Sequence, residues 1–125
     1  MLTKTRSVLA VHSLKDSVRF YRDALGMDVD FEAPGWCFLS RDNFAVMLGE
    51  CPDSIAPKDL GHHSYFAYVT VQDATALFKE FNSREVTFIK NLTDEPWGMR
   101  EFGVRSLDGH RIMFGQEFKV AAGAA

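Results

Sequence analysis

Apolar and polar positions follow the same order twice along this chain. Residues 6–18 read as a strand-like apolar run, then the short polar residue Ser13, then a helix-like run. Sixty positions later, residues 66–78 repeat this order with Asp73 in the place of Ser13. A supersecondary unit that occurs twice predicts two modules of one kind, packed as a pseudo-symmetric pair. Pairs of this kind tend to form a cleft where they meet.

The first copy predicts one strand, one helix and three more strands. Residues 6–12 read as a strand, and Ser13 with Asp16 resembles the capping box that begins a helix. Apolar residues at helical spacing run on to Leu25, and Gly26 is a suitable stop. Strict alternation and two further apolar runs, separated by turns, then predict strands over 27–32, 36–40 and 44–48.

The second copy predicts the same series of elements. A strand over 65–71 precedes Asp73, which is an equally good N-cap, and a helix with apolar residues at i, i+3, i+4 and i+7 follows. The remaining pattern predicts strands over 86–89, 100–105 and 110–115, with an irregular loop over 91–98. The chain is therefore expected to be one domain of two repeats, 6–48 and 65–116, with a linker over 49–63 and a disordered tail over 117–125.

The predicted fold class is α+β. Two βαβββ modules are expected to form a curved, cupped, mixed sheet of eight strands, with the helices outside and a hollow inside. Strand parity decides which side chains face the hollow, because neighbours along a strand point to opposite faces. It places Phe31 and Phe44 in the core. The side chains that parity directs toward the hollow are those of Met47, Phe66, Tyr68, Glu101, Arg105 and Met113.

Composition and charge narrow the function classes. The 125 residues are 46% apolar and 25% charged, which is typical of one globular domain with a core of its own. The net charge of −3 argues against a nucleic-acid partner. No apolar stretch is long enough for a membrane span, and the first residues lack a signal core. Two cysteines make no disulfide framework, so we expect a cytoplasmic protein with free thiols.

Two motifs resemble a known superfamily. The run from Leu14 through Phe20-Tyr-Arg-Asp-Ala-Leu-Gly26 resembles the first helix of the glyoxalase, bleomycin-resistance and extradiol-dioxygenase superfamily, the vicinal oxygen chelate fold. The stretch from Pro96-Trp-Gly to Asp108-Gly109 closely resembles a loop and strand of bleomycin-resistance proteins, although Ser-Leu stands where that branch usually has Asp-Pro. The resemblance covers residues 7–116.

The resemblance also indicates which residues occupy the metal-binding positions of the superfamily. Enzymes of the superfamily hold a divalent metal through His or Glu at four positions, which fall here on Arg6, Met47 or Leu48, Phe66 and Met113. None of these side chains is a usual ligand of a hard or borderline metal. The resemblance therefore implies no metal, no cofactor and no catalytic residue. It implies instead a homodimer that binds a small, partly aromatic molecule such as an antibiotic. The exposed edges of a small cupped sheet make strand exchange between subunits one route to this dimer.

The candidate ligand-binding residues combine the superfamily register, strand parity and the abundance of aromatic residues. Trp97 is either a stacking wall for a planar ligand or an anchor for its loop, and Trp36 and Phe38 share one parity that fits the cleft or the core. Polar candidates could equally form a solvated rim, and Glu101 is the natural partner of any buried arginine. The full set is Trp36, Phe38, Met47, Phe66, Tyr68, Trp97, Glu101, Arg105 and Met113.

Two enzymatic alternatives stay open. One is a glyoxalase-like metal-dependent lyase or dioxygenase with relocated ligands, drawn from His12, His62, His63 and Glu50. The other is an enzyme without metal that uses Glu101 as a base. The non-functional interpretation of His12 and His110 is that both are polar surface residues. Asp108-Gly109 indicates a turn and not a catalytic aspartate.

Overall fold

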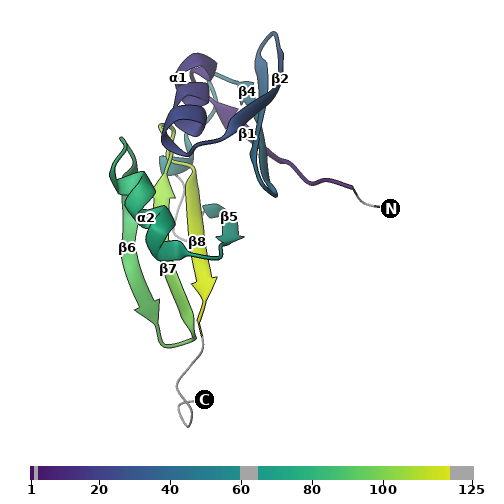
Figure 1. The fold of residues 1–125 in the computed structure, drawn as a ribbon. Helices are drawn as coiled ribbons and strands as arrows, with labels where there is room; N and C mark the ends of the chain where they lie inside the picture. The colour runs from purple at the N-terminus through teal and green to yellow at the C-terminus, as the bar shows by residue number, and fades with distance from the viewer. Residues whose placement is uncertain (2, 60–64, 119–125) are drawn as a thin grey trace. The chain divides into compact units, whose positions relative to one another are not determined.

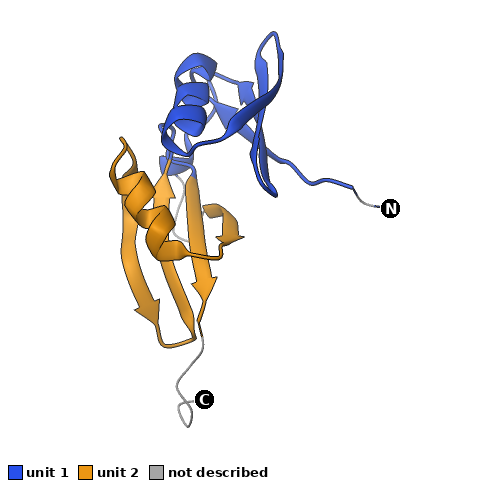
Figure 2. Cartoon of the chain, in the orientation of Figure 1, with its two compact units in different colours: residues 1–64, 106–110 blue, residues 65–105, 111–125 orange. Residues whose placement is uncertain are grey.

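The computed structural model describes residues 1, 3–59 and 65–118, which fall into two compact units (Figures 1 and 2). Unit 1 comprises Met1–Ser64 and Ser106–His110, and unit 2 comprises Tyr65–Arg105 and Arg111–Ala125. Each unit contains one copy of the predicted βαβββ module. The predicted α+β fold of two such modules is confirmed.

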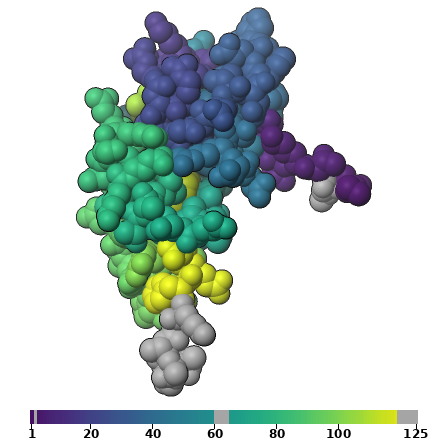
Figure 3. Space-filling model, in the orientation of Figure 1, coloured from purple at the N-terminus to yellow at the C-terminus, as the bar shows by residue number. Residues whose placement is uncertain are grey.

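Unit 1 contains a four-stranded mixed sheet with a helix on one face. Its strands lie in the order β1-β4-β3-β2, and β1 is parallel to β4 while the other pairs are antiparallel. The N-terminal segment ahead of β1 extends away from the rest of unit 1 (Figure 3). The elements are β1 (Ser7–Val11), α1 (Leu14–Arg19), the π-helical turn η1 (Phe20–Ala24), β2 (Asp28–Ala33), β3 (Trp36–Arg41), β4 (Phe44–Glu50) and the 3₁₀ turn η2 (Pro57–Asp59).

Unit 2 repeats this topology. Its sheet has the order β5-β8-β7-β6, again with one parallel pair, β5 and β8, followed by antiparallel pairs. The eight strands of the described ranges therefore lie in two sheets of four, one in each unit. The elements are β5 (Tyr65–Thr70), α2 (Ala74–Asn82), β6 (Thr87–Glu95), β7 (Met99–Arg105) and β8 (Arg111–Glu117).

The two helices begin in the same way, as the repeat predicts. The Ser13 side chain accepts a hydrogen bond from the Asp16 backbone N–H, and the Asp73 carboxylate accepts one from the Ala76 backbone N–H. Each cap satisfies one of the backbone donors that a helix leaves free at its N-terminus. Gly26 takes φ 72° just after the end of η1, where the sequence places a stop. Among the described residues, no helix is both long and apolar enough to cross a bilayer.

Each helix packs on one face of its own sheet. In unit 1, Tyr21 and Leu25 are fully buried together with Leu39, Val46 and Leu48 of the sheet. In unit 2 the core is aromatic, and Phe102 forms edge or stacked ring pairs with four neighbours at centroid distances of 5.2–6.0 Å. Each such pair adds about 0.5–1.5 kcal/mol beyond the area it buries. These neighbours are Phe78, Phe81, Phe88 and Phe114.

Two predictions about the strands are wrong. The segment 91–98 is not a loop over most of its length, because β6 continues to Glu95 and pairs with β7 before a short turn. Phe31 is not in the core: it is 55% exposed. The register between β2 and β3 shifts between Val29 and Phe31, and this irregularity turns Phe31 to the face away from α1.

The turn between β7 and β8 belongs to unit 1, although both strands belong to unit 2. Ser106 and His110 close it with a backbone hydrogen bond of 2.9 Å, and Gly109 within it takes φ 89°. The backbone N–H of Lys58 donates to the carbonyl of Asp108. The turn at Asp108-Gly109 is as predicted, but His110 is buried, at 6% exposure, and the expectation of a surface histidine is wrong.

Candidate functional site

A buried carboxylate organises a polar and aromatic group in unit 2. The Tyr68 hydroxyl donates to Glu101 Oε2 at 2.5 Å, and Lys90 Nζ donates to Glu101 Oε1 at 2.8 Å. Lys90 also pairs with Glu95 at 2.7 Å and lies 5.8 Å from the centroid of the Trp97 ring. We call these five residues the Glu101 cluster. It joins β5, β6, β7 and the β6–β7 turn on one face of the sheet.

The sheet register places this cluster on the side away from α2. Glu101 alternates with the core residue Phe102, so its side chain points to the opposite face. Gly115 of β8 is the direct partner of Glu101, and because it has no side chain the Tyr68 ring can lie across it and reach the carboxylate. Gly103 lies under the Met113 sulfur in the same way. Because the two glycines have no side chains, the Tyr68 ring and the Met113 sulfur can pack directly against the backbone of the sheet.

The electrostatics of the cluster favour an ionised Glu101. Burial acts to raise the pKa of Glu101, but the hydrogen bonds from Lys90 and Tyr68 outweigh it and the net pKa is lowered. Burial and the hydrogen bond to Glu101 both raise the pKa of Tyr68. Burial acts to lower the pKa of Lys90, but its bonds to Glu101 and Glu95 raise it overall. At neutral pH Glu101 is therefore a carboxylate, Lys90 an ammonium and Tyr68 a neutral phenol.

A second group lies on the sheet of unit 1, on the face away from α1. Phe38 and Met47 are direct cross-strand partners, and Phe31 packs edge-on against Phe38 at 5.5 Å between ring centroids. The Arg6 guanidinium lies 5.1 Å from the centroid of the Phe38 ring and pairs with Asp30 at 3.0 Å. This face is apolar with one cation held on it by an aromatic ring.

The predicted site residues divide between the units. Trp36, Phe38 and Met47 lie in unit 1, where the Trp36 ring rests over Gly49 and stays 40% exposed. The other six lie in unit 2. Of these, Tyr68, Trp97 and Glu101 meet in the Glu101 cluster, while Met113 is buried beside it, Phe66 is half-buried on β5, and Arg105 is exposed at the end of β7.

The sequence did not identify Lys90 and Glu95 as part of a site. Lys90 supplies the cation beside Glu101, where the sequence suggested an arginine, and Arg6 pairs with Asp30 instead. Both missed residues lie on β6, in or next to the stretch that was predicted to be a loop. Residues 87–95 do not alternate strictly between apolar and polar side chains, so this stretch carries no clear strand signal that could have found them.

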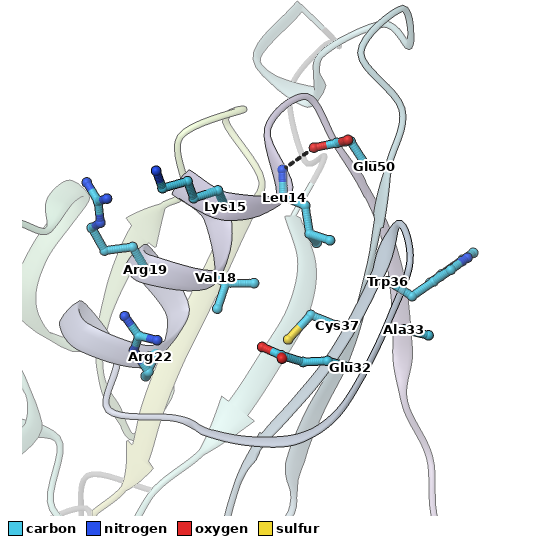
Figure 4. A pocket seen from close by; sticks show the side chains of 10 residues that line it. All are labelled: Leu14, Lys15, Val18, Arg19, Arg22, Glu32, Ala33, Trp36, Cys37 and Glu50. Carbon is cyan, nitrogen blue, oxygen red and sulfur yellow. Dashed lines mark hydrogen bonds between the residues drawn. The ribbon is translucent and has the colours of Figure 1, made fainter.

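A groove of about 590 Å³ lies in unit 1 between α1 and strands β2–β4 (Figure 4). Leu14 and Val18 of α1 form its apolar wall, and Glu32 and Cys37 line it from the sheet. Burial raises the pKa of the Cys37 thiol, so this cysteine is a poor nucleophile. Trp36 also borders the groove, but its ring points away from α1. The groove is thus distinct from the aromatic face of unit 1.

A family model decides the classification. The model of the Glyoxalase/Bleomycin resistance protein/Dioxygenase superfamily matches residues 5–114. The chain belongs to this superfamily. No curated protein matched the chain in a sequence search.

Solved structures of the superfamily share this fold. A glyoxalase/bleomycin resistance protein/dioxygenase from Alicyclobacillus acidocaldarius superposes with a TM-score of 0.80 at 14% identity, covering 94% of this chain and 92% of that one. TnmS3, an antibiotic binding protein from Streptomyces sp. CB03234, gives 0.71 at 19% identity, with coverages of 94% and 98%. Lactoylglutathione lyase from Agrobacterium tumefaciens gives 0.69 at 17% identity, with coverages of 91% and 92%. At these identities the likeness shows the fold.

The residues at the metal positions of the superfamily do not fit a divalent metal. They are Arg6, whose guanidinium is paired with Asp30, and Met47, Phe66 and Met113, none of which offers nitrogen or a carboxylate oxygen. Within the described ranges, no three His, Cys, Asp or Glu side chains gather in a way that could hold a metal ion.

Of the relocated ligands considered from the sequence, the two that lie within the described residues have other partners. His12 pairs with Asp108, and Glu50 accepts a hydrogen bond from the Leu14 backbone N–H. His62 and His63 lie outside the described residues.

Proposed function

We propose that this superfamily member binds a small, partly aromatic molecule, such as an antibiotic, without metal and without turnover. The observation that carries the proposal is the Glu101 cluster, where an exposed indole and a phenol stand beside a buried carboxylate that pairs with Lys90. Such a site offers a flat ligand one stacking surface and several fixed polar groups. These are the features by which binding pockets orient small molecules.

Trp97 is the part of the cluster best suited to stacking. Its side chain is 65% exposed, and Lys90 lies over its ring, so the indole is held in place while much of its surface remains free. Micromolar affinity corresponds to about 8 kcal/mol. One aromatic contact supplies about 0.5–1.5 kcal/mol beyond its buried area, so several contacts besides Trp97 are needed.

The chemistry of Glu101 supports binding over catalysis. A general base needs a pKa near the working pH and a free lone pair directed at the substrate. The pKa of Glu101 is lowered, and both of its carboxylate oxygens already accept hydrogen bonds. The non-donor residues at the metal positions argue in the same direction against a lyase or dioxygenase. TnmS3, which shares the fold, is described as an antibiotic binding protein.

The free cysteines suit the proposed location. Cys37 and Cys51 are both unpaired thiols, and Cys51 is exposed. Thiols persist in reducing compartments, which supports our proposal of a cytoplasmic location.

Isothermal titration with a panel of aromatic and glycopeptide antibiotics tests this function. We expect at least one compound to bind, with the same affinity before and after treatment of the protein with a metal chelator. Trp97→Ala should then weaken binding about tenfold, because it removes a stacking surface worth roughly 1 kcal/mol or more. It should hardly change the melting temperature, because the side chain is largely exposed.

The control is Ile55→Ala, which removes another exposed apolar side chain and lies in unit 1, outside the Glu101 cluster. It should leave affinity unchanged. Flat heats across the whole panel would count against the binding function. A stoichiometric nickel, zinc, manganese or iron content in the untreated protein would favour the metal-dependent enzyme instead.

We also propose a homodimer, with strand exchange between subunits as one form of it. The sheet of unit 1 exposes Val8 at 62% and Phe31 at 55%, and contiguous exposed apolar surface commonly marks an interface. Sedimentation equilibrium should give twice the 14.1 kDa of one chain, and Phe31→Glu should shift the population toward monomer. A wild-type mass of one chain would refute the dimer.

A further inference from the structure

Both ring nitrogens of His12 face oxygen atoms that can only accept hydrogen bonds. Nδ1 lies 3.1 Å from Asp108 Oδ1, and Nε2 lies 2.7 Å from the backbone carbonyl oxygen of Ser54. A carbonyl oxygen has no proton to donate, so Nε2 must carry its hydrogen. A carboxylate has none either, so Nδ1 must carry a second hydrogen, or Asp108 must be protonated.

Either arrangement holds one proton more than a neutral imidazole beside a carboxylate. We propose that His12, Asp108 and Ser54 form a proton-dependent latch that fastens the β7–β8 turn within unit 1. The latch is closed when the pair holds this proton and is weakened when the pair loses it. A lone pair on Nδ1 would then face a carboxylate oxygen at hydrogen-bond distance, with no hydrogen between them.

The latch joins three segments that are distant in sequence. His12 lies between β1 and α1, Ser54 follows β4, and Asp108 is in the turn at 106–110, which is 96 positions from His12. The His12 backbone N–H also donates to Asp108 Oδ2 at 3.1 Å, so one residue engages both carboxylate oxygens. Asp108 is buried, whereas the His12 side chain is 39% exposed.

His110, a second histidine near the latch, has a pH dependence of the opposite direction. His110 is buried beside Ser106, and burial, with a smaller contribution from His12, lowers its pKa despite Asp108. Its contribution to stability is therefore present above the ordinary histidine range and lost as the pH falls. Asp108 and His110 interact with His12 directly. The other titratable groups on the segments bonded to the latch are Tyr21, Glu50, Cys51, Asp53 and Lys58.

Asp108→Asn provides a sharp test because it reverses the proton requirement. The asparagine oxygen can still accept from the His12 backbone N–H, and its NH₂ group can donate to an unprotonated Nδ1. The variant latch is therefore satisfied by a neutral imidazole and opposed by an imidazolium. Asp108 acts to raise the pKa of His110, so Asp108→Asn also alters that residue. His12→Gln keeps Asp108 and is therefore the control for any contribution of His110.

Hydrogen exchange of the His12 and Gly109 amides reports whether the latch is closed, because both amides donate within or onto the turn. Each rate is divided by the intrinsic rate at the same pH. We expect wild-type protection to fall about tenfold between about pH 5.5 and 8, because the closed latch needs the extra proton. Asp108→Asn should gain protection over that range. His12→Gln, which has no titrating ring, should show low protection at every pH.

Two outcomes would overturn the latch. One is wild-type protection of the turn that does not change with pH. The other is a fall of the same size in wild type and His12→Gln, which would assign the effect to His110 or to another group. If Asp108→Asn does not fold, the comparison of wild type with His12→Gln decides the question alone.

Discussion

Gly115→Ala is expected to break the Glu101 cluster and to cause the largest loss of ligand affinity among simple substitutions. A Cβ at position 115 would lie 2.6 Å from Tyr68 Cζ and closer still to the Tyr68 oxygen. The phenol must therefore swing away from Glu101 and give up its hydrogen bond. Loss of one donor to a buried carboxylate costs about 1–3 kcal/mol of stability. Affinity for a ligand held by the cluster should fall about tenfold or more.

Denaturant unfolding of a double-mutant cycle checks the cause. Tyr68→Ala removes the side chain with which the new methyl group would collide, so Gly115→Ala should cost little in that background. An equal cost in both backgrounds would show that alanine acts on the strand itself and not through Tyr68. A second readout is the ultraviolet titration of tyrosine. The raised pKa of Tyr68 should return toward its ordinary value in Gly115→Ala.

Gly109→Ala is expected to be the most destabilising glycine substitution. Gly109 takes φ 89°, which L-residues rarely adopt and which costs them about 1–3 kcal/mol. In addition, a Cβ there would lie 2.7 Å from the Lys58 backbone nitrogen and 2.8 Å from its Cα. Backbone atoms cannot move aside as a side chain can, and overpacking adds about 1–3 kcal/mol. The free energy of unfolding should fall by about 3 kcal/mol or more.

Gly35→Ala is the matched control for this substitution. Gly35 also has a positive φ, 79°, but nothing lies within 4 Å of a Cβ built on it. It should therefore show the conformational cost alone, and the difference between the two variants measures the contact of the turn with Lys58. Equal costs would mean that the turn is held only loosely against η2.

Local patterns were sufficient where local physics decides the outcome. Ser13, Asp73 and Gly26 act at helix ends through contacts within a few residues, and the structure has them in those roles. Parity likewise separated Phe102 from Glu101. The matching topology of the two modules follows from the repeat. These features require no knowledge of which strands become neighbours.

The errors arise where a distant segment changes the outcome. The acidic end of β6 was interpreted as a loop, yet an edge strand needs only one partner and tolerates polar residues on its free side. The shifted register beside Phe31 depends on β3, and the turn that contains the buried His110 is bonded to His12, which lies 96 positions before Asp108. Lys90 could be recognised as a partner of Glu101 only once β6 was paired with β7.

The placement of residues 106–110 has a consequence for how the chain acquires its structure. A segment from the second half of the sequence completes the first unit, and its bonds close a loop of 96 residues. Long-range closure of this kind slows folding, because entropy is lost before the contacts form. During synthesis, residues 1–64 of unit 1 leave the ribosome before residues 106–110, which complete that unit, have been made. A gene cut between the repeats should therefore yield an N-terminal fragment that gains order only when the C-terminal fragment is supplied.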